Sequence, residues 1–207
     1  MEDVLDLYAE PLDPKRPVVC FDEKPLQLLE ETRVSRPVAP GQPALMDHEY
    51  RRKGTANIFM AVEPRGGWRR VTVTERRTKL DFAAEMKQLV DVDYPGAERI
   101  RVVLDNLNTH VLASLYEAYP ASEARRIARR LEFHHTPKHG SWLNMAEVEL
   151  SVLSGQCLDR RIADTVRFAR EAAAWTAARN RDRVCIHWRF TIDNARTKLK
   201  HLYPAQP

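Results

Sequence analysis

The chain has 207 residues, of which 43% are hydrophobic and 30% charged, and this balance excludes an intrinsically disordered protein. Its formal net charge of +4 comes from clustered basic residues, which favours a polyanionic partner. No run is apolar for long enough to cross a bilayer and the acidic N-terminus is not a secretory signal, so we expect a cytoplasmic protein without a membrane partner.

The first third of the chain is predicted to contain strands separated by irregular segments. Residues 1–16 form a lead-in segment rich in acids and prolines, and Val18–Phe21 is the first predicted strand because it is apolar and largely β-branched. Prolines and a glycine are expected to break any long element across residues 23–56. Two more strands are predicted at Ala56–Val62 and Trp68–Thr74. Pro64–Gly67 joins them as a hairpin loop.

Helices alternate with strands in the rest of the chain. Thr78 and Asp81 form a capping box that opens a helix to about Val90. The remaining predicted elements are a strand at Arg99–Leu104, helices at Val111–Tyr119 and Ser122–Arg129, a strand at Leu131–His134, a helix capped by Ser141 and ending near Ser154, a long helix at Ile162–Arg181 and a final helix from Asp193 to about Leu202.

This order of elements predicts a mixed sheet in a three-layer α/β sandwich, with an antiparallel portion that continues into parallel strands and crossover helices. The first and fourth strands are expected to lie side by side. Residues 17–160 are predicted to form the domain, and residues 161–207 a C-terminal helical extension that packs on it. Ligands bind beyond the strand ends of such sheets, which draws attention to Asp22 and Asp105.

Three acidic residues form the candidate catalytic and metal site. Asp22 and Asp105 each follow a predicted buried strand, and Glu147 lies inside a helical pattern. Carboxylates that converge in this way can hold a pair of divalent cations, which suits phosphodiester chemistry. The alternative is that each acid is only a strand-end or helix-surface charge, but the three contexts together favour a joint site.

Glu149 competes with Glu147 for the third position. The two are separated by about 200° around a helix, so only one can face the aspartates, and both helix faces carry apolar residues. Periodicity therefore does not decide between them. Glu23 would point to the opposite side of the strand from Asp22 and is predicted to be a structural or supporting acid.

The histidines do not predict a zinc site. His134, His135 and His139 have a spacing unlike structural zinc patterns and have no nearby cysteine, so we expect them to flank the cleft. His110 follows Asp105 closely and is equally compatible with a helix start and with a contact to the site.

Basic residues in predicted loops are the candidates for contact with backbone phosphates, whereas most other basic clusters are expected to be solvated faces. Trp142 can stack on a base or pack into the core. The candidate DNA-binding residues are Arg51, Arg52, Lys53, Lys138, His139 and Trp142.

The motifs resemble the DDE transposases of bacterial insertion sequences related to mariner elements, over nearly the whole chain from about Pro17. The resemblance is clearest where Leu143-Asn144-x-x-Glu147 indicates Glu147 rather than Glu149 as the third acid. The similar segments are Cys20–Pro25, Val103–His110, Thr136–Glu147, Asn180–Arg183, Trp188–Phe190 and Ala195–Leu199.

This resemblance implies a ribonuclease H-like fold and two Mg²⁺ ions, replaceable by Mn²⁺, at Asp22, Asp105 and Glu147. It also implies DNA strand cleavage followed by strand transfer during transposition. The implied partners are transposon-end and target DNA, with a homodimer on DNA, in the nucleoid-associated fraction of a bacterial cytoplasm.

Two other functions remain open from the sequence. One is a ribonuclease H-like nuclease that cuts without joining, and the other is an inactive transposase remnant that binds DNA non-specifically. Full-length members of the resembling family carry helix-turn-helix modules ahead of the catalytic domain. The residues ahead of Asp22 form no basic helical pair, so we expect no sequence-specific recognition of DNA ends by this chain alone.

Overall fold

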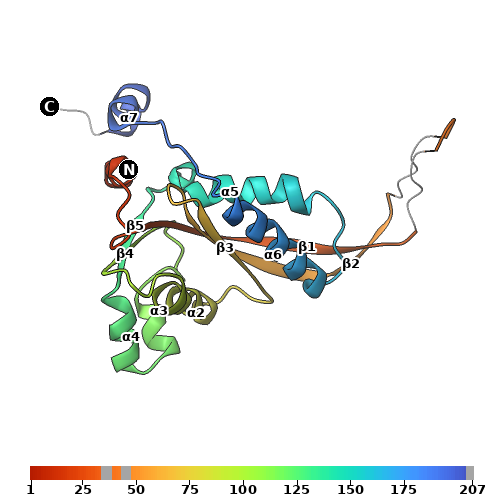
Figure 1. The fold of residues 1–207 in the computed structure, drawn as a ribbon, viewed down its shortest axis with the longest axis horizontal. Helices are drawn as coiled ribbons and strands as arrows, with labels where there is room; N and C mark the ends of the chain where they lie inside the picture. The colour runs from red at the N-terminus through yellow and green to blue at the C-terminus, as the bar shows by residue number, and fades with distance from the viewer. Residues whose placement is uncertain (34–38, 43–47, 204–207) are drawn as a thin grey trace.

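A five-stranded mixed sheet forms the centre of the protein, as expected from the order of elements (Figure 1). The computed structural model describes residues 1–33, 39–42 and 48–203. The strand order is β3-β2-β1-β4-β5, with antiparallel pairs on the β3 side and parallel pairs β1–β4 and β4–β5. The strands are β1 (Val18–Glu31), β2 (Tyr50–Glu63), β3 (Trp68–Thr74), β4 (Ile100–Leu104) and β5 (Leu131–His135).

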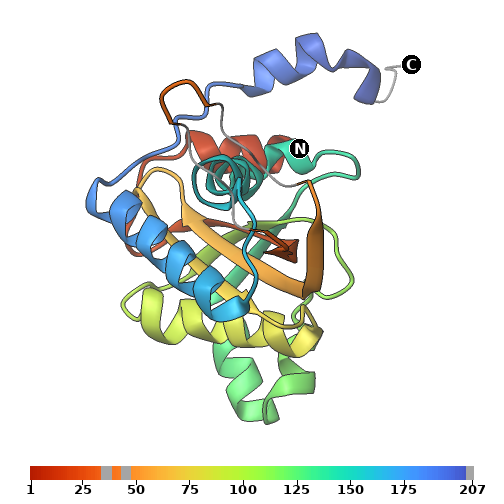
Figure 2. The same cartoon turned by 90° about the vertical axis from the view of Figure 1, so that its right-hand side faces the viewer.

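Helices cover both faces of the sheet, because strand side chains alternate between the faces (Figures 1 and 2). Val19 and Phe21 of β1 pack in one apolar cluster with residues of α2, α3 and α4. Cys20 packs in the other with residues of α1, α5 and α6. The helices are α1 (Glu2–Ala9), α2 (Lys79–Gln88), α3 (Ala113–Ala118), α4 (Ala121–Ala128), α5 (Met145–Leu153), α6 (Thr165–Arg181) and α7 (Ile192–Lys198).

The first two strands are much longer than expected. The prediction of an irregular segment at residues 23–56 is wrong for most of its described part, because β1 continues to Glu31 and β2 begins at Tyr50. The portions at 34–38 and 43–47 lie outside the described residues. Pro25 is tolerated inside β1 because the strand pairs with β4 only as far as Cys20, which leaves one edge without a sheet partner at Pro25. The end of β1 and the start of β2 continue past the other three strands as a two-stranded arm, in which Leu29–Glu31 pair with Tyr50–Arg52 (Figure 1).

Several helix boundaries also differ from the predicted ones. Ser141 does not cap α5 but starts a short 3₁₀ turn, η2 (Ser141–Leu143), and Asn144 is the N-cap. Thr191 rather than Asp193 caps α7. Short turns η1 (Leu89–Asp93) and η3 (Ser154–Leu158) extend α2 and α5, and η4 (Lys200–Leu202) follows α7. The Thr78–Asp81 capping box and the β2–β3 hairpin are confirmed.

The lead-in segment is ordered and contributes to the core. Val4, Leu5 and Leu7 of α1 are buried, and the Tyr8 hydroxyl donates to the Leu143 carbonyl at 2.7 Å. At the other terminus, α6 packs along β3, and α7 lies against α1 (Figure 2), where Ala195 is buried and Arg196 pairs with Glu2. The division at residues 16 and 160 stays a prediction. Within the described chain, no helix combines the length and apolar character needed to span a bilayer.

Candidate active site

Two aspartates lie where the parallel strands β1 and β4 end their pairing. Asp22 follows Cys20, the last residue of β1 that pairs with β4, and shares the face that carries α5. Asp105 comes directly after β4. The last residue pair between β1 and β4 at that end is Cys20 with Val103. The backbone N–H of Glu23 donates to Oδ1 of Asp22 at 2.8 Å. β1 and β4 therefore lie side by side, as expected for the first and fourth strands, and their pairing brings both carboxylates to one end of the sheet.

Helix α5 brings Glu147 to the same end. Asn144 caps the helix by accepting from the Ala146 N–H at 3.1 Å, and its Nδ2 donates to the Phe21 carbonyl at 2.8 Å. This side chain joins the first turn of α5 to β1, one residue before Asp22. Glu147 lies in that first turn, where the helix dipole favours a carboxylate.

The three carboxylates influence one another electrostatically. Burial raises the pKa of Asp22 to about 7, and the negative charges of Asp105 and Glu147 add to the increase. Burial and the charge of Asp105 also raise the pKa of Glu147. A cation between these groups would relieve the repulsion, so the donor set fits divalent metals that prefer oxygen ligands. Among the described residues, no three acidic, histidine or cysteine side chains already form a metal-binding arrangement.

His110 contacts the site rather than merely starting a helix. Its Nδ1 donates to Oδ1 of Asp105 at 2.6 Å and its Nε2 donates to Oε2 of Glu23 at 2.7 Å. Burial alone would lower the pKa of His110, but the two carboxylates raise it to about 9. Burial alone would raise the pKa of Asp105, but the His110 hydrogen bond and charge hold it below its ordinary value. Sequence reasoning placed Glu23 on the far side of β1 but did not connect it to His110.

Glu149 has different surroundings from Glu147. Its buried carboxylate lies 2.7 Å from Nε of Arg69 and 2.6 Å from Nε of Arg179, which come from β3 and α6. Glu147 is exposed and is coupled to the aspartates. The structure therefore places Glu149 in the packing of α5 on the sheet and Glu147 at the candidate site.

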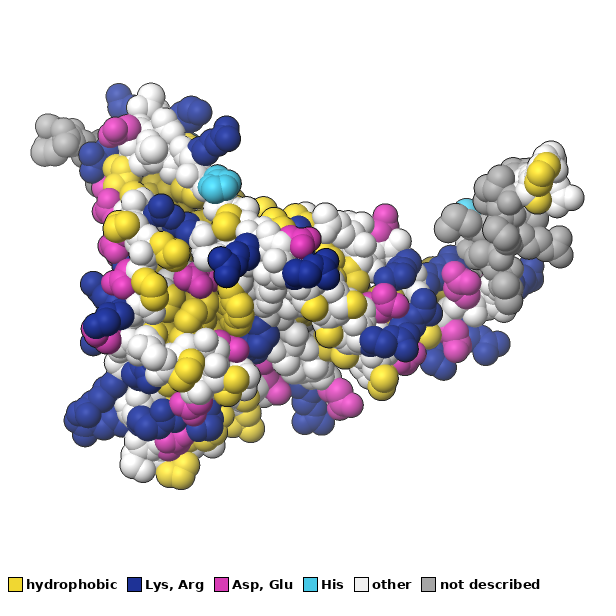
Figure 3. Space-filling view, in the orientation of Figure 1, with side chains coloured by type: hydrophobic (Ala, Val, Ile, Leu, Met, Phe, Trp, Pro, Cys, Tyr) yellow, Lys and Arg dark blue, Asp and Glu magenta, His cyan; other side chains and the backbone are white. Residues whose placement is uncertain are grey.

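Among the candidate DNA-binding residues, three lie on the β1–β2 arm. The expectation that Arg51, Arg52 and Lys53 belong to a loop is wrong, because they are exposed residues of β2. Arg51 and Arg52 pair there with the end of β1, and the Lys53 ammonium lies 3.5 Å from the Glu30 carboxylate. Lysine and arginine side chains gather on the arm and over α4 in Figure 3.

The other candidates lie near the segment that leads to Glu147. Lys138 and His139 are exposed on the turn after β5. Trp142 is 42% exposed and stacks on Trp188, with ring centroids 6.1 Å apart, so it is neither buried in the core nor free of packing. Of the two adjacent histidines, His134 donates to Asp3 at 2.9 Å, whereas His135 donates to the backbone carbonyl of Asp105 at 3.3 Å.

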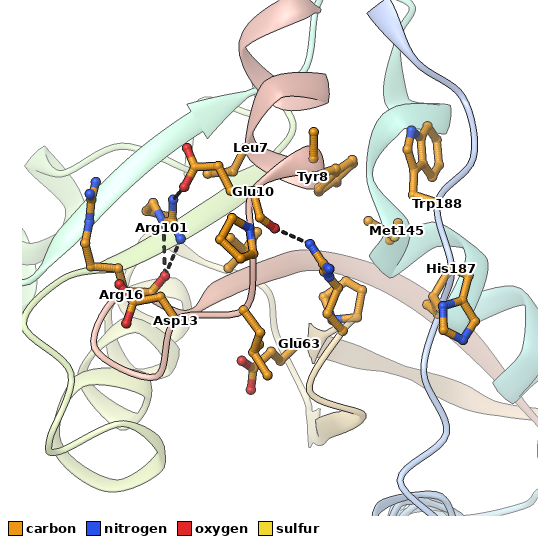
Figure 4. Close-up of a pocket in the computed structure, with 17 residues that line it drawn as sticks. Leu7, Tyr8, Glu10, Asp13, Arg16, Glu63, Arg101, Met145, His187 and Trp188 are labelled. Carbon is orange, nitrogen blue, oxygen red and sulfur yellow. Dashed lines mark hydrogen bonds and ion pairs between the residues drawn. The ribbon is translucent and has the colours of Figure 1, made fainter.

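A pocket of about 240 Å³ lies at the other end of the sheet, between α1, the β2–β3 loop and the segment before α7 (Figure 4). Tyr8, Met145 and Trp188 line it, and none of Asp22, Asp105 and Glu147 does. Arg101 in its wall is held by the Glu10 carboxylate and the Arg16 carbonyl. This pocket is separate from the acidic site.

The chain thus combines a mixed five-stranded sheet with a group of carboxylates at one end of its parallel strands. The chain belongs to the DDE superfamily endonucleases, whose family pattern matches residues 17–168. No curated protein matches the chain.

The fold is ribonuclease H-like and is similar to that of Mos1 transposase in two solved complexes. The Mos1 transposase paired-end complex with left transposon end has a TM-score of 0.58 and 16% identity, over 88% of this chain and 55% of that chain. The Mos1 strand transfer complex has a TM-score of 0.55 and 18% identity, over 86% of this chain and 51% of that chain. The chain thus spans about half the length of these relatives.

Proposed function

We propose that this DDE endonuclease domain is the catalytic domain of a transposase, which cleaves DNA strands at transposon ends and joins them to target DNA. The observation that carries the proposal is the placement of Asp22, Asp105 and Glu147 at one end of the sheet. Three different elements deliver them there, and their charges already act on one another. Such a cluster of acids costs free energy in the absence of a cation, which is characteristic of a functional site.

The three acids are the proposed metal ligands. Asp22 and Asp105 would hold one divalent ion between them, and Asp22 and Glu147 would hold a second. Two Mg²⁺ or Mn²⁺ ions held by these residues would supply Lewis-acid activation of water or of a DNA 3′-hydroxyl and would stabilise the leaving oxygen. The chain's own contribution is the fixed positions of these carboxylates on β1, β4 and α5. No protein nucleophile is needed.

Exposed basic residues are proposed to bind the DNA backbone. Arg51 and Arg52 project from the arm, and Lys138 lies on the turn that leads to Glu147. Phosphate contacts of this kind position a duplex without reading its sequence. The partly exposed face of Trp142 is proposed to contact an unpaired base.

The joining step and a dimer on DNA are further parts of the proposal. They are supported by the shared fold with Mos1 transposase, whose structures are a paired-end complex with a transposon end and a strand transfer complex. A domain that only nicks DNA would share the acids but would not join ends.

The test compares the native chain with Asp22→Asn, Asp105→Asn and Glu147→Gln in Mn²⁺-dependent nicking of supercoiled DNA. Each variant should lose nicking while it stays folded, because each removes charge from a shared site. Glu98→Gln is the control, since Glu98 is an exposed acid paired with Lys15. Chelation of the metal should abolish nicking by the native chain. Native-like nicking by all three variants would contradict the proposal.

A second assay supplies pre-cleaved ends and target DNA. Joined products support a transposase, whereas nicking without joining identifies a hydrolytic nuclease. An inactive DNA-binding remnant would do neither, while still retarding DNA on a gel.

A further inference from the structure

A buried chain of hydrogen bonds connects β1 to Asp105. The side chains of Glu23 and His110 are only 3% and 1% exposed. His110 donates from both ring nitrogens, to Glu23 at 2.7 Å and to Asp105 at 2.6 Å. Burying the Glu23 carboxylate and the His110 ring costs free energy unless both are paired, and the bond to Asp105 completes the pairing of His110.

The surroundings hold His110 in one orientation. Its ring packs against Phe82, with centroids 4.9 Å apart, and meets Phe21 edge-on at 5.9 Å. Its backbone N–H donates to the Leu107 carbonyl at 2.9 Å, which closes the turn between Asp105 and α3. The imidazole therefore cannot turn without disturbing the core.

The hydrogen bonds around Asp105 engage only one of its two carboxylate oxygens in the described part of the chain. Oδ1 accepts from His110 and, at 3.3 Å, from the backbone N–H of Leu107. Within the described part of the chain, Oδ2 has no hydrogen-bond partner. The Asp105 side chain is 27% exposed, so the carboxylate is partly accessible from solvent.

We propose that Glu23 and His110 are positioning residues that hold Oδ1 of Asp105 and so present Oδ2 as the oxygen that takes a divalent cation. The inference rests on the proposed function, because it assigns a role to residues around the same acids. Neighbouring residues of β1 then serve the site from opposite faces of the strand. Asp22 is a metal ligand on one face, and Glu23 anchors the imidazole on the other.

A purely structural role for the pair predicts a different outcome. Loss of a packing interaction lowers the stability of the fold but leaves the metal affinity of the folded protein unchanged. A positioning role lowers the metal affinity as well. Removal of a hydrogen-bonded partner behind a metal ligand typically weakens metal binding by about 10- to 100-fold.

The experiment measures Mn²⁺ affinity by calorimetry and thermal unfolding for Glu23→Gln, His110→Gln and the double variant. Glu63→Gln is the matched control, because Glu63 is a half-buried acid that accepts from the Tyr94 hydroxyl at 3.1 Å, away from the candidate acids. Each single variant should raise the Kd for Mn²⁺ by about 10-fold or more. The double variant should be no weaker than the weaker single one, because both act through one chain. The control should keep the native Kd.

A measurement on the native chain keeps the inference testable if the variants do not fold. The His110 Nδ1 resonance, followed by NMR of ¹⁵N-labelled histidine, should shift during a Mg²⁺ titration with the midpoint found by calorimetry. An unchanged resonance at metal saturation, or unchanged Kd values in folded variants, would overturn the positioning role and leave the proposed function standing. A native chain that binds no divalent metal would overturn both.

Discussion

At the scale of single residues, two glutamates two positions apart perform different tasks. Helix geometry turns Glu149 toward β3 and α6, where it lies between Arg69 and Arg179 with its side chain 1% exposed. Glu147 remains in the first turn beside the aspartates. Removing the buried charge of Glu149 leaves its arginine partners buried and unpaired, whereas removing the exposed charge of Glu147 leaves no buried partner unpaired.

Glu149→Gln should therefore lower the free energy of unfolding by about 3–5 kcal/mol, because two arginines lose their countercharge in a buried position. Glu147→Gln should change it by less than about 0.5 kcal/mol, as expected for an exposed residue. Urea unfolding of both variants in metal-free buffer gives the comparison. At temperatures where Glu149→Gln is folded, it should retain nicking. Equal stabilities for the two variants would contradict this division of roles.

At the scale of elements, the junction between α5 and β1 determines where Glu147 lies. One side chain, Asn144, performs two tasks there, since its oxygen caps the helix and its amide group binds the Phe21 carbonyl. Placement of the third acid thus depends on a residue that is not itself proposed to bind metal.

Asn144→Ala should lower stability by about 1–2 kcal/mol, the usual effect of losing an N-cap, and should reduce nicking of the protein that stays folded. Asn144→Asp is the matched variant, because it keeps the capping oxygen and lacks the donor to Phe21. A loss of nicking shared by both variants assigns the effect to the connection with β1. Normal nicking by folded Asn144→Ala would show that the connection is not needed.

Ion pairs between the C-terminal end of α2 and α4 predict that the stability of the fold depends on pH in the acidic range. The hydrogen bond from Arg126 lowers the pKa of Asp91 from 3.8 to about 2, with help from Lys87. A lowered pKa in the folded state means that the stabilisation is complete above the unfolded value of 3.8 and disappears as the pH falls through about 2. The pairs are partly exposed, so solvent screening limits the effect to about 1 kcal/mol or less.

Asp91→Asn should therefore be less stable than the native chain at pH 6 by at most about 1 kcal/mol. The difference should shrink below pH 4 and vanish near pH 2. Urea unfolding across this range measures it. A difference that grows as the pH falls would have the wrong sign and would exclude this ion pair as its source.

At the scale of the whole molecule, basic side chains lie on separate surfaces. Arg51 and Arg52 are on the arm, whereas exposed Arg125 lies on α4 and exposed Arg129 is the C-cap of that helix. If the chain binds DNA as proposed, charges spread in this way would contact backbone phosphates over a broad surface and not a defined set of base edges.

DNA binding by the chain should consequently depend steeply on salt and little on sequence. The logarithm of the affinity should fall linearly with the logarithm of the salt concentration, because phosphate contacts release counterions. Replacing Arg51 and Arg52 together by alanine should reduce the slope by about 2 if both bind phosphates. Fluorescence anisotropy with two unrelated duplexes measures both effects. A salt-insensitive complex with only one of the duplexes would contradict this expectation.

Local patterns in the sequence determined much of the fold and predicted Asp22 and Asp105 as candidate acids, whereas the resemblance to a known family favoured Glu147 over Glu149. The apolar runs before Asp22 and Asp105 predicted the central parallel pair, and Trp68–Thr74 is a strand with the predicted bounds. Burial alternation and capping chemistry are properties of neighbouring residues, so they can be recognised without the fold.

Only the tertiary structure decided the features that depend on residues far apart in the chain. The lengths of β1 and β2 follow from their pairing across the sheet, which overrides the proline in β1. The surroundings of Glu147 and Glu149 depend on which side of α5 meets Arg69 and Arg179. The link from Glu23 through His110 to Asp105 joins residues 87 positions apart, and no local pattern records it. Such contacts form only when the packed core brings their elements together, because their free energy comes from burial and not from sequence neighbours.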